Sequence, residues 1–275
     1  MTRNIVLAGW AQMTQPKNLD TPPLDILALM AEVSGQACKM AGISSDRDMP
    51  QGIMVVLPGS RTVPAPADQL AHRLCASPSL KIVSKVGGNS PQTLINRAAG
   101  MIARNEIDSV LIAGAECYIR REDPPQAVDS ALFRGIPHDY DGDDFVGSTP
   151  LENRHGIEHP MQGFPLFETA LWAASGKDLN TYLKGVGQMW AGFSRVAAGH
   201  PNAWSRAVRT WEEIVTPGPA NRPIAFPYPK FMNAFVSVDQ GAAVLLMAET
   251  GAEKLKPDTR HRVYFAGGGY AEDRQ

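Results

Sequence analysis

Segment 86–92, VGGNSPQ, holds the residue types that are best suited to acyl chemistry. Ser90 is predicted to cap the N-terminus of a helix, and Pro91 to be its first residue. The exposed N–H groups of a helix start attract anions and developing negative charge. Gly87 and Gly88 permit a close approach of another group to the backbone. The segment therefore predicts either an acyl or oxyanion pocket or an ordinary connection between a strand and a helix.

Ser90 does not have the sequence context of a nucleophile. The nucleophile elbow of many hydrolases has the pattern G-x-S-x-G. Gly88 lies two residues before Ser90, but Gln92 lies two residues after it. We therefore predict a binding role for this segment and assign no nucleophile to it.

Glu116 and Cys117 end an apolar run, LIAGAEC. A carboxylate in that place could orient a catalytic loop or pair with an arginine, but structural hydrogen bonding is the more common role. Cys75 and Cys117 lie in apolar segments and are expected to be small buried residues. The three cysteines are far apart in the sequence, which fits a reducing compartment better than a disulfide framework.

Two short motifs resemble metal sites but lack parts that such sites need. HGIEH, at 155–159, has the spacing of one class of zinc peptidase, yet a glycine interrupts it and a proline follows it. DYDGDD, at 139–144, resembles the front of a calcium loop, but the position that needs a bidentate glutamate is Pro150. We expect solvated histidines and an acidic turn, with no metal.

The first third of the chain alternates between predicted strands and predicted helices. Short apolar runs predict strands at 4–10, 52–59, 80–86 and 108–116, and helical spacing predicts helices at 22–42, 65–76 and 90–106. This alternation is typical of an α/β sheet with parallel crossovers.

Residues 118–233 interrupt this pattern and are predicted to form an inserted loop domain. The region is rich in proline, glycine and aromatic residues, and it contains two helical stretches, at 163–176 and 179–200. The core, 1–117, is expected to resume over 234–275 with a strand at 241–250, a helical turn at 251–256 and a strand at 261–270.

The composition is that of an ordinary globular protein. The chain has 275 residues, 44% of them hydrophobic, and a net charge of −2 without any block of like charges. This charge distribution is no reason to expect nucleic acid or an anionic membrane as a partner. The apolar run at the N-terminus is too short for a signal peptide, and no run reaches the roughly 18 residues of a membrane span. The expected location is the cytoplasm.

The order and spacing of several motifs resemble the N-terminal half of the thiolase superfamily. The strand ends in IAGAE and VDQGAAVLLMAE, with the segments NAWSR and NRPIAFPYPKFMNA, are similar to the sterol-carrier-associated proteins described as acetyl-CoA acetyltransferases. In that superfamily the reactive cysteine of a C-x-S-G helix start lies 28 residues before a strand-end glutamate. Counting back 28 residues from Glu116 reaches Gly88 and aligns Ser90 with the serine of the motif.

The resemblance implies a thiolase-like half, a mixed sheet flanked by helices, with an inserted loop domain. It also implies that the nucleophile position is Gly88, and a glycine cannot form a thioester. The N-E-A motif of the second thiolase half does not occur in these 275 residues, and the triplet GHP occurs only at 199–201, inside the predicted loop domain rather than in a second half. No catalytic residue of the family can therefore be assigned to this chain.

The function implied by the resemblance is the handling of acyl-CoA. Gly88, Asn89 and Ser90 are the expected contacts of the thioester, and coenzyme A thioester is expected as a substrate rather than as a cofactor. Acyl transfer, with formation or cleavage of a carbon–carbon bond, is expected if a second half is present. The alternative is a non-catalytic acyl-CoA-binding or scaffold subunit that partners a zinc-ribbon/OB-fold protein. A homodimer, or pairing with a C-terminal thiolase half, is the expected assembly.

Overall fold

The computed structural model describes residues 3–16, 22–45, 48–118, 148–235, 237–255 and 262–271. The chain divides into two compact units. The first comprises Met1–Gly142 and Ser237–Gln275, and the second comprises Asp143–Val236. Each unit is described by itself.

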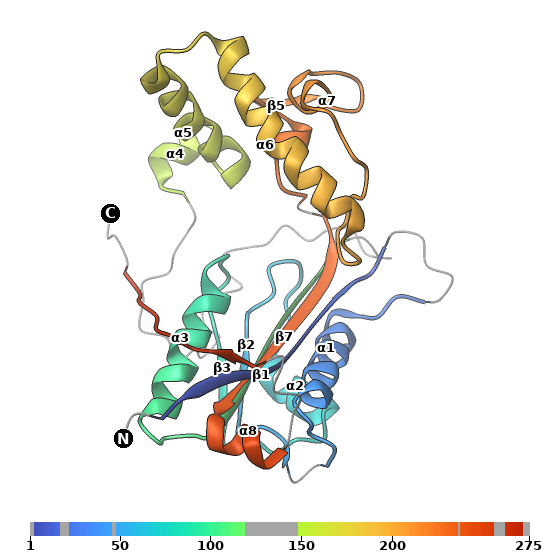
Figure 1. The fold of residues 1–275 in the computed structure, drawn as a ribbon, viewed down its shortest axis with the longest axis vertical. Coiled ribbons are helices and arrows are strands. Elements are labelled where there is room, and N and C mark those ends of the chain that lie inside the picture. Colours follow the sequence, from blue (N-terminus) through green and yellow to red (C-terminus); the bar gives the residue numbers. More distant parts are fainter. Residues whose placement is uncertain are drawn as a thin grey trace. The chain divides into compact units, whose positions relative to one another are not determined.

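A six-stranded mixed sheet forms the centre of the described part of the first unit (Figure 1). Its strands are β1 (Ile5–Thr14), β2 (Gly52–Val55), β3 (Leu80–Val83), β4 (Ser109–Cys117), β7 (Asp239–Ala248) and β8 (Val263–Tyr264), in the order β3-β2-β4-β7-β1-β8. β2 runs parallel to β3 and β4, whereas β7 is antiparallel to β4 and β1, and β8 is antiparallel to β1. The predicted fold class, a mixed α/β sheet flanked by helices, is confirmed.

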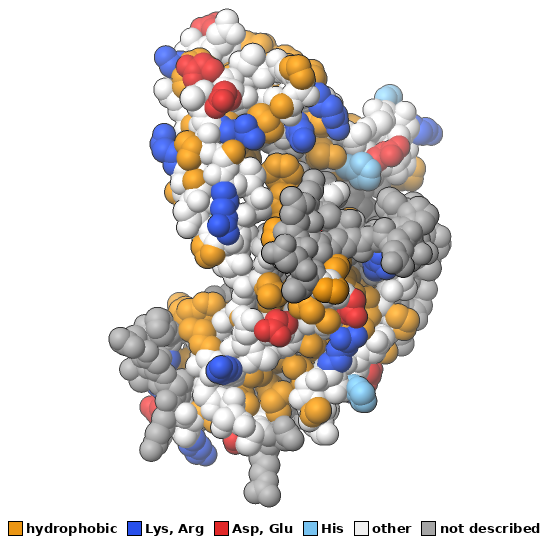
Figure 2. Space-filling model, turned by 90° about the vertical axis from the view of Figure 1, so that its right-hand side faces the viewer, with side chains coloured by type: hydrophobic (Ala, Val, Ile, Leu, Met, Phe, Trp, Pro, Cys, Tyr) orange, Lys and Arg blue, Asp and Glu red, His pale blue; other side chains and the backbone are white. Residues whose placement is uncertain are grey.

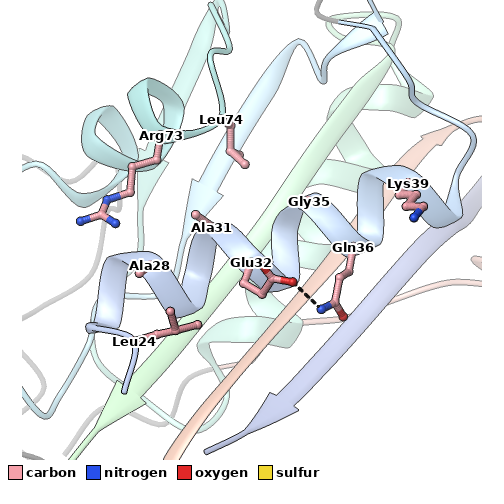
Figure 3. Close-up of a pocket in the computed structure, with 9 residues that line it drawn as sticks. All are labelled: Leu24, Ala28, Ala31, Glu32, Gly35, Gln36, Lys39, Arg73 and Leu74. Atoms are coloured by element: carbon pink, nitrogen blue, oxygen red, sulfur yellow. Dashed lines mark hydrogen bonds between the residues drawn. The ribbon is translucent and has the colours of Figure 1, made fainter. Parts of the chain in front are cut away.

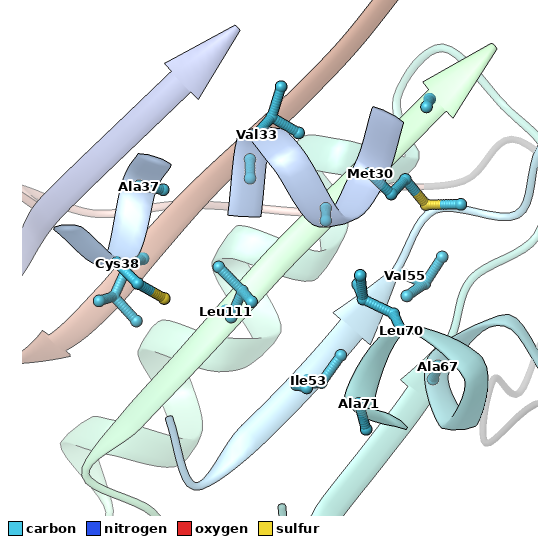
Figure 4. Packing of buried hydrophobic residues seen from close by; sticks show 14 of the residues in the cluster. Met30, Val33, Ala37, Cys38, Ile53, Val55, Ala67, Leu70, Ala71 and Leu111 are labelled. Carbon is cyan, nitrogen blue, oxygen red and sulfur yellow. The ribbon is translucent and has the colours of Figure 1, made fainter. Parts of the chain in front are cut away.

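Helices cover both faces of this sheet because its strands alternate apolar side chains between the two faces. α1 (Ile26–Met40), α2 (Pro66–Arg73) and the short α8 (Glu249–Leu255) share one hydrophobic cluster, and α3 (Ser90–Ala103) belongs to another. On β4, Leu111 and Ala113 belong to the α1 cluster, while Val110 and Ile112 belong to the α3 cluster. Figure 4 shows Leu111 of β4 close to α1, with α2 lying over β2.

α1 approaches the backbone of β1 very closely at Gly9. A Cβ on Gly9 would lie 2.0 Å from the backbone oxygen of Ala37 and 3.1 Å from the backbone nitrogen of Ala41. The register of β1 against β7 shifts between Leu7 and Gly9. The contact between helix and strand therefore depends on a residue without a side chain.

Two strands differ in length from the prediction. β1 continues to Thr14 instead of ending near residue 10, because its polar end still pairs with β7, up to Thr14 opposite Gln240. The last strand has two residues instead of the predicted ten, and the chain after it crosses α3, where Asn96 donates a hydrogen bond to the carbonyl of Gly269 (3.1 Å).

The second unit is mainly helical. It contains α4 (Pro150–Arg154), α5 (Pro160–Ser175), α6 (Leu179–Gly199), α7 (Trp211–Val215), the hairpin strands β5 (Pro223–Ala225) and β6 (Tyr228–Pro229), and the 3-10 helix η3 (Lys230–Met232). The two predicted helices are confirmed as α5 and α6. The prediction of loop for residues 216–230 is wrong in part, since they contain a short antiparallel hairpin that begins at Pro223 and ends at Pro229.

Asn221 connects three segments of the second unit through its buried side chain. Its Nδ2 donates to the carbonyls of Glu213, Ile214 and Thr216, and its Oδ1 accepts the N–H of Phe231 at 2.8 Å. These carbonyls lie at the end of α7, where a helix leaves acceptors without an intrahelical partner.

We expect Asn221→Ala to destabilise the second unit by about 3 kcal/mol, because it leaves several backbone groups without their partner. Chemical denaturation of the full chain would measure the loss. Asn180→Ala, at an exposed position of α6 in the same unit, is the control and should change stability by less than about 0.5 kcal/mol. Equal effects of the two substitutions would contradict the assigned role.

Glu168 of α5 accepts hydrogen bonds from two phenols. Tyr182 of α6 donates to one carboxylate oxygen and Tyr228 of β6 donates to the other. The bond to Glu168 raises the pKa of Tyr182 to about 12, and burial, together with the same carboxylate, raises the pKa of Tyr228. One carboxylate thereby ties α5, α6 and the hairpin together.

These raised pKa values predict a loss of stability at alkaline pH. An unfolded tyrosine has a pKa near about 10, so folding favours the protonated phenol. The contribution is complete below a pH of about 10 and is lost as the pH rises through the folded-state value of about 12. Between a pH of about 10 and a pH of about 12, the midpoint of chemical denaturation should fall more steeply with pH for the wild type than for Tyr182→Phe. Parallel curves for the two proteins would exclude this linkage.

The second unit exposes many large apolar side chains. Phe164, Phe167 and Leu171 of α5 and Met189 and Phe193 of α6 are each more than half exposed. Trp190, between these two residues of α6, packs against the cluster of Ala191, Ile214 and Met232. Figure 2 shows apolar side chains interspersed with charged ones over the visible surface. None of the helices in the described ranges has the length and apolar character needed to cross a membrane.

Candidate functional site at the carboxyl ends of the parallel strands

The carboxyl ends of β2, β3 and β4 lie at one edge of the sheet because the three strands are parallel. In open α/β sheets this edge is where ligands usually bind. We call residues 57–60, 84–90 and 116–118 the strand-end rim. Its segments are in contact, since a Cβ on Gly59 would lie 3.5 Å from Cγ1 of Val86 and 3.4 Å from Oε1 of Glu116.

Ser90 is held inside the turn that follows β3. Its Oγ donates to the carbonyl of Lys85 at 2.8 Å, its N–H donates to the carbonyl of Gly87 at 3.1 Å, and the residue is 7% exposed. Asn89, with no capping bond from its side chain, is the N-cap of α3. The prediction that Ser90 caps the helix is therefore wrong, because its hydroxyl bonds backwards to Lys85 and the helix begins one residue earlier. This hydroxyl is committed to a carbonyl, which agrees with assigning it no nucleophilic role.

Two N–H groups at the start of α3 remain open to a ligand. Among the described residues, no hydrogen-bond partner is found for the N–H of Asn89 or of Gln92. Pro91 between them has no N–H, and Asn89 itself is exposed. The arrangement can stabilise a carbonyl oxygen that gains negative charge.

Gly88, the predicted nucleophile position, faces open space. Among the described residues, and apart from its two chain neighbours, no atom would lie within 4 Å of a Cβ there, and its φ lies outside the left-handed region. A side chain could therefore occupy this position without strain or a clash. The neighbouring Gly87 is more restricted, since a Cβ on it would lie 2.9 Å from Oδ1 of Asn89.

Glu116 has the structural role that was expected for it. Its Oε1 accepts the N–H of Gly59 and its Oε2 accepts the N–H of Ser60, both at 2.7 Å. In return, Oγ of Ser60 accepts the N–H of Cys117 at 3.1 Å. We call these three hydrogen bonds the Glu116–Ser60 clamp; they fasten the loop after β2 to the end of β4.

Asp239 is a second carboxylate at this edge, and sequence reasoning missed it. It is fully buried, stands opposite Cys117 in the pairing of β4 with β7, and accepts the N–H of Tyr118 on Oδ1 at 2.6 Å. The only signal in the sequence is an acidic residue placed two residues before the apolar run GAAVLLMA.

None of the three cysteines presents an exposed thiol at the rim. Cys38 lies in the core, where burial raises the pKa of its thiol to about 11. Cys117 is buried as predicted, but the prediction for Cys75 is wrong. Cys75 follows the C-terminal end of α2 with a φ of 52°, and the helix ending leaves it exposed.

The metal-like motifs do not form ligand clusters in the part of the chain that the structure describes. His155 is the C-cap of α4 and His159 is the N-cap of α5, so the two do not share one helix face. The acidic segment 139–144 lies outside the described residues.

A groove of about 570 Å³ lies elsewhere, along the solvent-facing side of α1. Figure 3 shows its floor, which is formed by small residues of α1, and its charged edges. The residues that line it are Leu24, Ala28, Ala31, Glu32, Gly35, Gln36, Lys39, Arg73 and Leu74. No residue of the strand-end rim contributes to this groove.

Searches with the sequence found no matching family model and no matching curated protein. Comparison of the fold with solved structures did find relatives. A monomeric SCP2-thiolase-like protein type 1 from Mycobacterium smegmatis is 27% identical, with a TM-score of 0.72, over 94% of this chain and 49% of that one. The Ltp2-ChsH2(DUF35) aldolase is 18% identical, with a TM-score of 0.65, over 91% and 57%.

Human mitochondrial 3-ketoacyl-CoA thiolase, solved in complex with CoA, is 16% identical, with a TM-score of 0.58, over 94% of this chain. The chain spans about half the length of the first of these structures and 57% of the second. Its fold is that of the thiolase superfamily, in the SCP2-thiolase-like form, as the motifs predicted.

Proposed function

We propose that this chain binds coenzyme A thioesters, with the thioester carbonyl at the start of α3. The observation that carries the proposal is the open N–H of Asn89 beside the unoccupied space at Gly88. Ser90 was the third expected contact. Its hydroxyl and its N–H donate to the carbonyls of Lys85 and Gly87, so its role is to hold the turn rather than to donate to the thioester. The thiolase fold supports the choice of ligand, since one solved relative holds CoA.

The reaction that fits this fold is acyl transfer or the making and breaking of a carbon–carbon bond next to a thioester. Gly88 offers no thiol to carry the acyl group, so the chain's contribution would be to bind and polarise the carbonyl. A nucleophile, an acid and a base would come from a C-terminal thiolase half or from a second chain. The active assembly would be a homodimer of this chain or its pairing with a C-terminal thiolase half.

Calorimetric titration with CoA and acetyl-CoA tests the proposal. Asn89→Pro removes the open N–H, and the φ of Asn89, −88°, lies near the proline range. It should weaken acetyl-CoA binding, whereas Asn89→Ala keeps the N–H and should bind like the wild type. Absence of acetyl-CoA binding by the wild type, or equal binding by both variants, would reject the site.

The second candidate function is a non-catalytic subunit that presents acyl-CoA to a partner protein. Two observations favour it: the residue at the nucleophile position is Gly88, and one solved relative is the Ltp2-ChsH2(DUF35) aldolase. The partner would be a protein of the zinc-ribbon/OB-fold kind. Turnover of acyl-CoA by the purified chain alone would reject this candidate, and turnover that requires such a partner would support it.

A further inference from the structure

We propose that Glu116 and Ser60 are positioning residues of the acyl-CoA site and that their clamp fixes one wall of it. This inference rests on the proposed function and assigns a role to residues that do not contact the thioester themselves. The clamp joins positions 57 residues apart in the sequence, at the ends of the adjacent parallel strands β2 and β4.

The clamp binds the loop from both sides. The two oxygens of Glu116 accept consecutive N–H groups at 2.7 Å, the short distance of charge-assisted hydrogen bonds. The hydroxyl of Ser60, which is 3% exposed, accepts the N–H of Cys117 in the reverse direction. A loop held by three such bonds has little freedom to shift relative to β4.

The clamped loop lies against the turn that carries Gly88. The α-carbon of Gly59 faces Val86, two residues before Gly88, and the hydroxyl of Tyr118 lies 3.7 Å from the position of a Cβ on Gly59. Tyr118 is fixed in turn by Asp239, which accepts its N–H. The clamp therefore sets the place of Gly59, which contacts both Tyr118 and Val86, and Val86 belongs to the segment that leads to Gly88.

Glu116→Gln tests this inference because it keeps the size of the side chain and replaces one acceptor oxygen by an NH₂ donor. We expect hydrogen exchange of the Gly59 and Ser60 amides to accelerate by about tenfold or more, because one of them loses its acceptor. We also expect acetyl-CoA affinity to fall by about tenfold, as positioning is lost. Ser60→Ala should show the same two changes to a smaller extent.

Two control variants separate positioning from general stability. Glu106→Gln changes an exposed carboxylate at the opposite end of β4, where Glu106 bonds to Arg104, and should leave exchange and affinity unchanged. Ile53→Val trims a fully buried residue of β2, so it should lower stability while acetyl-CoA affinity stays at the wild-type value.

Three results would overturn the inference. Unchanged exchange of Gly59 and Ser60 in Glu116→Gln would show that the clamp does not hold the loop. Faster exchange with unchanged acetyl-CoA affinity would show that the loop does not shape the site. A wild type that binds no acetyl-CoA would reject the proposed function and the positioning role together, and that result differs from binding that is lost only in Glu116→Gln.

Discussion

Gly9→Ala is expected to destabilise the chain by about 3–5 kcal/mol, the largest loss of stability predicted here for one methyl group. The added Cβ would lie 2.0 Å from the backbone oxygen of Ala37. The atoms nearest to the added Cβ belong to the backbone of α1, so no flexible side chain can move to relieve the clash. Relief requires α1 to move away from β1, and that movement would open the cluster around Leu29, Met30 and Val33, none of which is exposed to solvent.

The measurement is chemical denaturation of the full chain, followed by circular dichroism. Gly35→Ala is the matched control, since it makes the same chemical change in α1 at a position with no other residue within 4 Å of the new Cβ. It should raise stability by about 0.5–1 kcal/mol through better helix propensity. A Gly9→Ala protein as stable as the wild type would show that α1 and β1 are not packed as described.

Gly88→Cys is expected to produce an acyl acceptor where the wild type has none. Among the described residues, and apart from the two chain neighbours, no atom lies within 4 Å of the new Cβ, so stability should change by less than about 1 kcal/mol. A thiol near a helix N-terminus has a lowered pKa and a larger thiolate fraction. If the thioester carbonyl binds at Asn89, the thiolate attacks that carbonyl, the acyl group moves to the introduced sulfur, and CoA leaves as its thiolate.

Mass spectrometry after incubation with acetyl-CoA would detect this transfer, and the exposed Cys75 is the internal control. Acetylation of the introduced thiol should saturate with acetyl-CoA concentration, because it proceeds from a bound complex. Acetylation of Cys75 should be slower and rise linearly. Equal rates at the two thiols would mean that the acyl group reacts from solution and that the strand-end rim does not bind it.

Local patterns predicted most helices and strands of the first unit because each has a regular apolar period. α1 and α3 lie inside their predicted ranges, and β4 extends one residue beyond its range, to Cys117. The polar end of β1 was missed because its strand character comes from pairing with β7, a partner more than 220 residues away in the sequence. The β5–β6 hairpin was missed because the prolines of that segment were interpreted as turn residues.

The sequence predicted which chain segments form the site, but not the contacts between them. The turn at Gly88 and the end of β4 stand out in the sequence because glycines and a charged residue terminate apolar runs. The partners of Glu116 could not be predicted, since Gly59 and Ser60 meet it through backbone N–H groups that any residue except proline carries. The bond of Ser90 was predicted wrongly because serine hydroxyls bind either the N–H groups of a helix start or a nearby backbone carbonyl. Only the folded turn brings the carbonyl of Lys85 within reach of Ser90.

The pairing of Cys117 with Asp239 has a consequence for how this protein could be engineered and how it could diversify. The chain leaves the sheet at the end of β4 and returns at the start of the neighbouring β7, so the two ends of the intervening segment, Cys117 and Asp239, lie side by side. A segment whose two ends are adjacent can be exchanged, shortened or replaced by a brief linker without changing the order of the strands. The segment between β4 and β7 is in this sense a replaceable module, and chimaeras that swap it between relatives would keep the order and pairing of the sheet strands.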